Sequence, residues 1–160
     1  MIQFKLICVG KIKEKYLKEG IDEYLKRLSA FVKTDVIEVL EEKSTGQISE
    51  SDITKVIDAE GIKIIEKIPN GSIVVTLEIE KELLSSVELA DWINQTSIYH
   101  SSQICFIIGG SYGLSDEVKK RADNAISFSK MTFPHQLMRL ILLEQLYRSI
   151  TLLNHITYHK

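Results

Sequence analysis

A glycine-rich segment that follows an apolar run is the first place where this sequence offers chemistry. Residues 109–113 read Gly-Gly-Ser-Tyr-Gly and come straight after the apolar run from Gln103 to Ile108. Ligands in α/β sheets bind at the carboxyl ends of strands, where glycines let backbone amides approach them closely. The spacing fits neither the dinucleotide fingerprint nor the Walker phosphate loop. The segment is therefore either a tight turn, which the spacing favours, or one wall of another kind of binding site.

A second candidate is the loop of residues 128–135, which reads Phe-Ser-Lys-Met-Thr-Phe-Pro-His. It leaves a short predicted strand and enters a long predicted helix, with Pro134 at the helix start. The loop is unusually apolar and has few turn-forming residues. It suits wrapping around a flat ligand such as adenine, and the alternative is an ordinary strand-to-helix connection that buries itself.

Polar side chains on the long helix form a third set. His135 and Arg139 are four residues apart and share a helix face, and Arg148 lies further along. An arginine on a largely apolar helix needs a partner, and Glu144 or a phosphate would serve. The alternative is that these charges are solvated or pair across a dimer.

The elements that must position these residues alternate between strand and helix patterns. The predicted strands are residues 3–9, 35–39, 73–77, 103–108 and 125–129, and the predicted helices are 16–28, 53–68, 85–93, 116–124 and 134–153. This order predicts one α/β domain over residues 1–160, with a parallel sheet covered on both faces. The polar segment from Glu41 to Ser51, which contains Gly46, is predicted to be a mobile loop.

The last helix is apolar around nearly its whole circumference. Such a helix is expected to be buried on all sides. Either it is a central core helix, or a homodimer packs through it.

Composition restricts the class of protein. The chain has 160 residues, 44% of them apolar, and a net charge of −2, so it lacks the basic excess of proteins that grip free nucleic acid. Cys8 and Cys105 lie in apolar runs and are expected to be buried thiols. No metal-ligand cluster is visible, so no metal is expected. With no signal peptide and no apolar run of about 18 residues, the protein is expected to be cytoplasmic.

The motifs SFSKMTFPHQ, EQLYR and the terminal YHK, together with VGKIKEKY near the start, resemble the SPOUT methyltransferases. More narrowly, the whole chain is similar to the ribosomal RNA large subunit methyltransferase H family, the pseudouridine N3-methyltransferases. The resemblance implies an α/β parallel-sheet SPOUT methyltransferase fold with a C-terminal trefoil knot, which no sequence pattern could indicate. It also implies a homodimer with the site at the subunit interface.

The resemblance further implies S-adenosylmethionine as cofactor. The family's cofactor contacts correspond to Leu77, Gly109 and the run Phe128, Ser129, Lys130, Met131, Thr132 and Phe133. The implied reaction moves the methyl group to N3 of a pseudouridine in helix 69 of 23S ribosomal RNA, on the assembled ribosome. In-line alignment supplies the proximity advantage, and no metal is needed.

Removal of the N3 proton requires a base or help from a cation. The candidates are Arg148, Tyr158, His159 and Lys160, the last three reaching into the partner's pocket. Relatives often end in Tyr-His-Arg, so the terminal lysine lacks the bidentate phosphate geometry of arginine. Two alternatives remain: a tRNA methyltransferase of the same fold, and a non-catalytic ribosome-binding or RNA-binding module.

Overall fold

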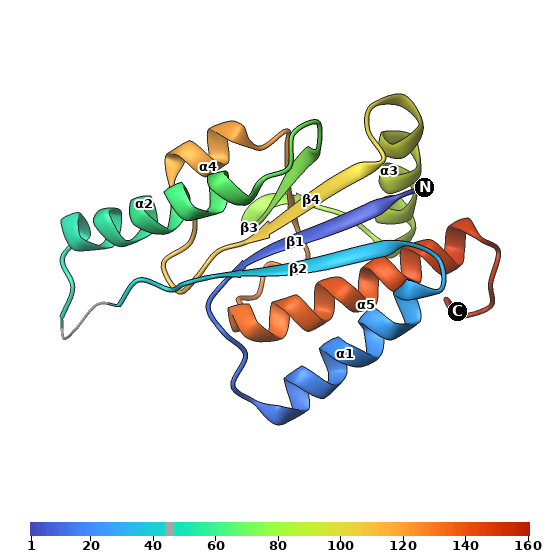
Figure 1. Ribbon diagram of the computed structural model, residues 1–160, viewed down its shortest axis with the longest axis horizontal. Coiled ribbons are helices and arrows are strands. Elements are labelled where there is room, and N and C mark those ends of the chain that lie inside the picture. The colour runs from blue at the N-terminus through green and yellow to red at the C-terminus, as the bar shows by residue number, and fades with distance from the viewer. Residues whose placement is uncertain (44–46) are drawn as a thin grey trace.

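The computed structural model describes residues 1–43 and 47–160 and contains a five-stranded sheet in the order β2-β1-β4-β3-β5 (Figure 1). The strands are β1 (Gln3–Val9), β2 (Lys33–Val39), β3 (Ile73–Leu83), β4 (Gln103–Ile108) and β5 (Asn124–Ser127). Each neighbouring pair is parallel. The predicted α/β parallel sheet is therefore confirmed.

Within residues 1–43 and 47–160, five helices cover the two faces of this sheet. They are α1 (Lys15–Ser29), α2 (Glu50–Lys67), α3 (Ser86–Tyr99), α4 (Asp116–Arg121) and α5 (His135–Leu153). One core lies between the sheet and α1, α3 and α5, and a second, smaller core lies on the face that α2 and α4 cover (Figure 1). No helix among the described residues is long and apolar enough to cross a membrane.

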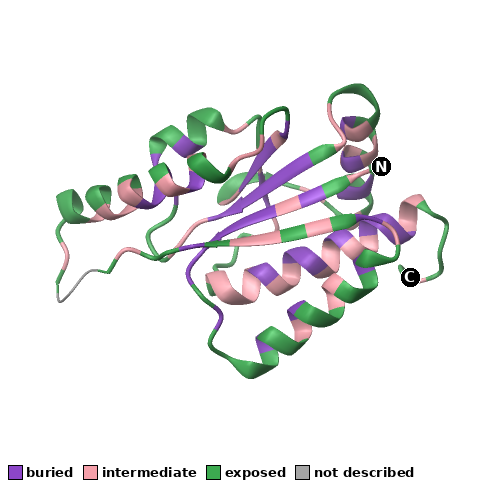
Figure 2. Cartoon of the chain, viewed as in Figure 1, coloured by how far each residue is buried: buried purple, intermediate pink, exposed green. Residues whose placement is uncertain are grey.

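Side chains alternate along the central strands between these two cores. Figure 2 shows that buried residues gather on the central strands of the sheet. Cys8 belongs to the α5 side and Cys105 to the α2 side, so the two thiols lie on opposite faces of the sheet. Both are free, and burial raises the pKa of each to about 12. The expectation of two buried thiols is confirmed, and neither is poised for redox chemistry.

One side of the long helix α5 is buried by its own chain, and the other side is half-buried. It packs between α1 and α3, and Leu142, Leu143 and Leu146 are completely buried. The approach to α1 is close, because a Cβ on Gly20 would lie 3.0 Å from a methyl carbon of Leu140. The apolar circumference thus indicates a core helix and does not by itself require a second chain.

Several element boundaries differ from the sequence-based prediction. The segment expected to be a loop to Ser51 ends earlier, because a capping box between Ser49 and Asp52 starts α2 at Glu50. Gly46, which belongs to that predicted loop, lies outside the described residues. Strand β3 runs six residues beyond Leu77, to Leu83, with an irregular register opposite β5 between Leu77 and Glu82. Pro134 occupies the N-cap rather than the first turn of α5.

Candidate functional site

A cavity of about 1050 Å³ lies at the carboxyl ends of β3, β4 and β5. Its walls are the end of β3, the glycine segment after β4, the loop after β5 and the first turn of α5. Among the residues predicted to bind the cofactor, those that line the cavity are Leu77, Gly109, Phe128, Ser129, Met131, Thr132 and Phe133. Lys130 is exposed and does not line the cavity.

The glycine segment is both a tight turn and a wall of the cavity. The amide of Gly113 donates to the carbonyl of Gly110 at 3.1 Å, and Gly113 has a φ of +88°. A Cβ on Gly109 would lie 2.8 Å from the carbonyl oxygen of Gly113. The turn therefore closes so tightly that only glycine fits at position 109 without a backbone shift.

The apolar loop after β5 is held by serine hydroxyls. The Ser127 hydroxyl donates to the Ser129 carbonyl at 2.8 Å, and the Met131 amide donates to the Ser129 hydroxyl at 2.9 Å. These side-chain bonds replace the turn-forming residues that the loop lacks. They leave apolar side chains, such as Phe128 and Phe133, in the wall of the cavity.

The basic and imidazole groups at the start of α5 have unlike surroundings. Arg139 is buried and donates to the Glu38 carboxylate at 2.7 Å and to the Gly10 carbonyl at 3.0 Å. Its partner is thus Glu38 of β2, and not Glu144 or a phosphate. His135 lines the cavity, its buried Nε2 has no partner among the described residues, and burial lowers its pKa. The imidazole is therefore neutral at physiological pH.

Sequence reasoning did not find the charged residues of the cavity wall, which are Glu78, Glu80, Lys81 and Lys119. Glu78 accepts a hydrogen bond from the Thr76 hydroxyl at 2.7 Å, and the ammonium of Lys119 lies 3.7 Å from its other oxygen. Both Glu78 and Lys119 line the cavity. The signal in the sequence was Thr76 and Glu78, two residues apart at a strand end, which places both on one side of the strand.

The four candidate catalytic residues lie at the other end of α5. The Arg148 guanidinium donates to Glu144 at 2.9 Å, lies 4.6 Å from the ring centre of Tyr158 and is 3.1 Å from Nδ1 of His159. Tyr158 also packs edge-on against Tyr147 at 4.9 Å between ring centres. Lys160 is exposed at the end of the chain. We refer to Glu144, Tyr147, Arg148, Tyr158 and His159 as the tail cluster.

Electrostatics in the tail cluster keep its phenol neutral and its guanidinium charged. Burial, together with Tyr24 and Glu144, raises the pKa of Tyr158 above its ordinary value. The hydrogen bond to Glu144 raises the pKa of Arg148. Tyr158 is therefore a proton donor or a stacking surface and a poor general base, whereas Arg148 is a permanent cation.

A single chain does not bring the tail cluster and the cavity together. Arg148 lies 10 residues beyond Met138, the last residue of α5 that lines the cavity, and at a rise of about 1.5 Å per residue these positions are roughly 15 Å apart. The tail cannot serve the cavity of its own chain without leaving Tyr147 and Glu144.

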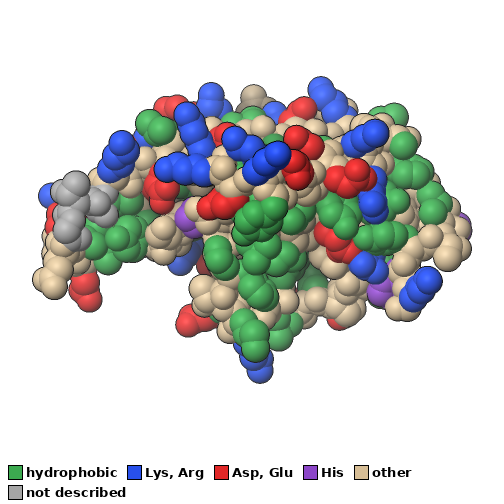
Figure 3. Space-filling view, turned by 90° about the horizontal axis from the view of Figure 1, so that it is seen from below, with side chains coloured by type: hydrophobic (Ala, Val, Ile, Leu, Met, Phe, Trp, Pro, Cys, Tyr) green, Lys and Arg blue, Asp and Glu red, His purple; other side chains and the backbone are tan. Residues whose placement is uncertain are grey.

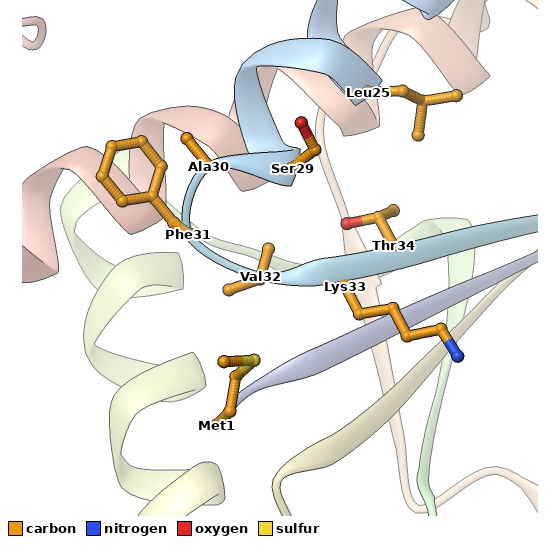
Figure 4. Close-up of a pocket in the computed structure, with 8 residues that line it drawn as sticks. All are labelled: Met1, Leu25, Ser29, Ala30, Phe31, Val32, Lys33 and Thr34. Atoms are coloured by element: carbon orange, nitrogen blue, oxygen red, sulfur yellow. The ribbon is translucent and has the colours of Figure 1, made fainter.

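A second, smaller hollow of about 400 Å³ lies where α1 connects to β2, at the opposite end of the sheet (Figure 4). Its wall is largely apolar, with Phe31 and Val32 beside the charged Lys33. None of the residues predicted to act in catalysis or cofactor binding lines it. The larger cavity is therefore the candidate site.

The parallel sheet and the cavity beyond three neighbouring strands define the class: an α/β protein that binds a ligand at its strand ends. Residues 2–159 match the family model described as predicted SPOUT methyltransferase, and the chain belongs to that family. S-adenosylmethionine is the methyl donor that these methyltransferases use. The resemblance stated from the motifs is confirmed.

Individual relatives agree with this assignment. The chain is 50% identical over 159 residues to a protein of Bacillus pumilus (strain SAFR-032) named ribosomal RNA large subunit methyltransferase H, covering 99% of this chain and 100% of the relative. A protein of the same name from Bacillus thuringiensis subsp. konkukian (strain 97-27) is also 50% identical over 159 residues, with the same coverage. Among solved structures, a probable methylase family protein from Haemophilus influenzae Rd KW20 is similar, with a TM-score of 0.51 at 13% identity over 99% of this chain and 70% of that one. That likeness concerns the fold alone.

Proposed function

We propose that this chain, acting as one domain over residues 1–160, methylates N3 of a pseudouridine in helix 69 of 23S ribosomal RNA on the assembled ribosome. The observation that carries the proposal is the cavity at the strand ends, whose wall includes Leu77, Gly109 and most of the run from Phe128 to Phe133. Half of the residues are identical, over nearly the full chain, to relatives named for methylation of the large-subunit ribosomal RNA.

The residues of the cavity fit S-adenosylmethionine. Apolar side chains, among them Ile126, Phe128 and Phe133, provide a slot for a flat adenine ring, and the tight approach at Gly109 leaves backbone amides within reach. The cofactor supplies an activated methyl group on a positively charged sulfur. The chain supplies orientation and exclusion of water, which bring donor and acceptor into line.

The tail cluster suits the ribosomal RNA side of the reaction. Arg148 offers a permanent positive charge near the base, and Tyr158 offers a neutral ring and a proton-donating hydroxyl. His159 and Lys160 are exposed and accessible to the RNA backbone. We propose that Arg148 stabilises the anion that forms when N3 loses its proton, while the tail positions the base.

We also propose that two chains form a homodimer in which the tail of one serves the cavity of the other. The separation of roughly 15 Å between Arg148 and Met138 within one chain supports this arrangement. On the face where α1 and α5 lie, hydrophobic side chains form a band between charged groups (Figure 3), and this band is suited to a second copy. Light scattering at micromolar concentration tests the dimer, and a monomer mass would refute it.

Family membership further supports the C-terminal trefoil knot. The segment that forms it would contain the loop after β5 and the start of α5, both of which line the cavity. An experimental structure traced through residues 124–160 tests the threading.

One assay separates this function from its two rivals. The protein is incubated with labelled S-adenosylmethionine and either 70S ribosomes or bulk tRNA. We expect label in 23S RNA only; label in tRNA would support the tRNA methyltransferase. Calorimetry with millimolar S-adenosylmethionine covers the third possibility, because a non-catalytic module would give no heat.

A further inference from the structure

We infer that Glu78 recognises the ribose hydroxyls of the adenosine cofactor, held in position by Thr76 and Lys119. The inference rests on the proposed cofactor site and adds a residue that discriminates the sugar. It starts from the position of Glu78 directly after Leu77, in the cavity wall where β3 stops pairing with β4.

The local path of β3 explains why this carboxylate borders the cavity. Pairing with β5 is regular to Leu77 and resumes only at Glu82. The residues between them, including Glu78, leave the ladder and form one rim of the cavity. A strand irregularity of this kind redirects side chains beside a binding site.

Contacts on both sides hold the Glu78 carboxylate. Thr76, which is completely buried, donates its hydroxyl to Oε2 at 2.7 Å. Lys119 of α4 lies 3.7 Å from Oε1. The Glu78 side chain retains 14% of its exposure, and a carboxylate has about four acceptor positions. Two neighbours therefore leave acceptor capacity for a ligand in the cavity.

The charge of this site favours hydroxyl groups over a second cation. Lys119 already compensates the negative charge of Glu78. A ligand's ammonium or sulfonium group would therefore gain less electrostatic binding energy here than beside an unpaired carboxylate. A vicinal diol brings two neutral donors that can bind the two oxygens of one carboxylate, in short charge-assisted bonds. In an adenosine cofactor the ribose carries that diol.

Calorimetry on the full chain tests the inference with S-adenosylhomocysteine and its 2′-deoxy and 3′-deoxy analogues. In the unmodified chain we expect each deoxy analogue to bind roughly tenfold more weakly, as for loss of a hydrogen bond to a charged group. Glu78→Gln should weaken the binding of S-adenosylhomocysteine about tenfold. The same substitution should cause little further loss of affinity for the deoxy analogues. Thr76→Val should cause a smaller loss of affinity, and that loss should also depend on the presence of the ribose hydroxyls.

Glu82→Gln is the matched control, because Glu82 is exposed on the same strand and does not line the cavity. The inference would be overturned if Glu78→Gln bound S-adenosylhomocysteine with unchanged affinity. It would also be overturned if this variant lost the same affinity for S-adenosylhomocysteine and for both deoxy analogues. Melting temperature confirms that each variant is folded, and Glu78→Asp, which keeps the charge on a shorter arm, replaces any glutamine variant that is not. If the unmodified chain itself gave no heat, the cofactor site and this inference would both be refuted.

Discussion

The two ends of α5 lie in very different surroundings. At its start, His135 borders a cavity of about 1050 Å³ whose wall is mostly backbone and apolar side chains. Towards its end, Arg148, Tyr158 and Glu144 pack against one another through ion pairs and ring contacts. The first end has room for a ligand, and the second presents side chains on the surface.

This difference indicates how one helix can serve two substrates. The cavity end is built within the chain, since β3, β4, β5 and α5 all contribute to its wall. The tail cluster has polar groups of the right kind for RNA, but its Arg148 lies roughly 15 Å along α5 from Met138, which lines the cavity. In the proposed homodimer, each chain would supply a cavity to one site and a tail to the other.

Removing the tail should give the largest effect. Deletion of Tyr158 to Lys160 is expected to lower methylation of 70S ribosomes by more than about 100-fold, the scale of a lost acid–base or charged group. Cofactor affinity measured by calorimetry should stay within about twofold, because none of the three deleted residues lines the cavity of its own chain. Unchanged turnover would exclude a catalytic tail.

A mixing experiment sharpens the same prediction. Chains with the tail deletion, mixed with Gly109→Ala chains after dissociation and reassociation, should recover part of the lost turnover. Recovery is expected because one subunit of the mixed dimer has an intact cavity and the other an intact tail. If each tail served its own chain, no recovery would occur.

Gly109→Ala should affect the cavity end selectively. The new Cβ would lie 2.8 Å from the Gly113 carbonyl oxygen, and overpacking of this kind costs about 1–3 kcal/mol. We expect cofactor binding to weaken roughly 5- to 100-fold in calorimetry.

The control for this change is Gly71→Ala, at the other end of β3. Gly71 has a φ of +79°, and a Cβ added there would meet nothing within 4 Å, so the variant should lose about 1 kcal/mol of stability and no cofactor affinity. Equal loss of affinity in both variants would contradict a local role for Gly109.

Arg139→Met should lower the stability of the fold, whereas Arg148→Met should lower turnover. Arg139 is 2% exposed and bonded to Glu38 and Gly10, so its loss should lower the free energy of unfolding by about 2–3 kcal/mol. Urea unfolding measures this. Arg121→Met, which removes an exposed pair with Asp123, should cost under about 1 kcal/mol. A similar loss of stability in Arg139→Met and Arg121→Met would show that the burial of Arg139 is unimportant.

Glu60→Gln should give the smallest effect, and one that depends on pH. Glu60 is buried behind the glycine turn, and burial raises its pKa above 4.5. Because the folded-state pKa is the higher one, ionisation costs stability as pH rises through it, and the cost is absent below 4.5. The variant should melt about 1–2 °C higher than the unmodified chain at pH 8, with no difference at low pH. A difference independent of pH would refute this.

The sequence predicted the elements whose patterns are local. Apolar runs located the strand from Gln103 to Ile108 to the residue, and Ser85 with Glu88 located the start of α3, because burial of a strand and helix capping depend on neighbouring residues. The motifs identified the family, and they predicted that Gly109 and the run from Phe128 share one cofactor site; the structure shows that Gly109 and most of this run line one cavity.

Only the tertiary structure decided which distant residues meet. Arg139 pairs with Glu38, which is 101 residues away in sequence, and no local pattern indicates that partner. The burial of α5 between α1 and α3, and the position of Glu78 on the cavity rim, likewise depend on long-range packing and on a change of strand register. The sequence predicted the length of α5, which separates the tail of one chain from its own cavity. The packing of Tyr158 against Tyr147, which holds the tail at that end, brings together residues from the helix and the chain end and was decided by the tertiary structure.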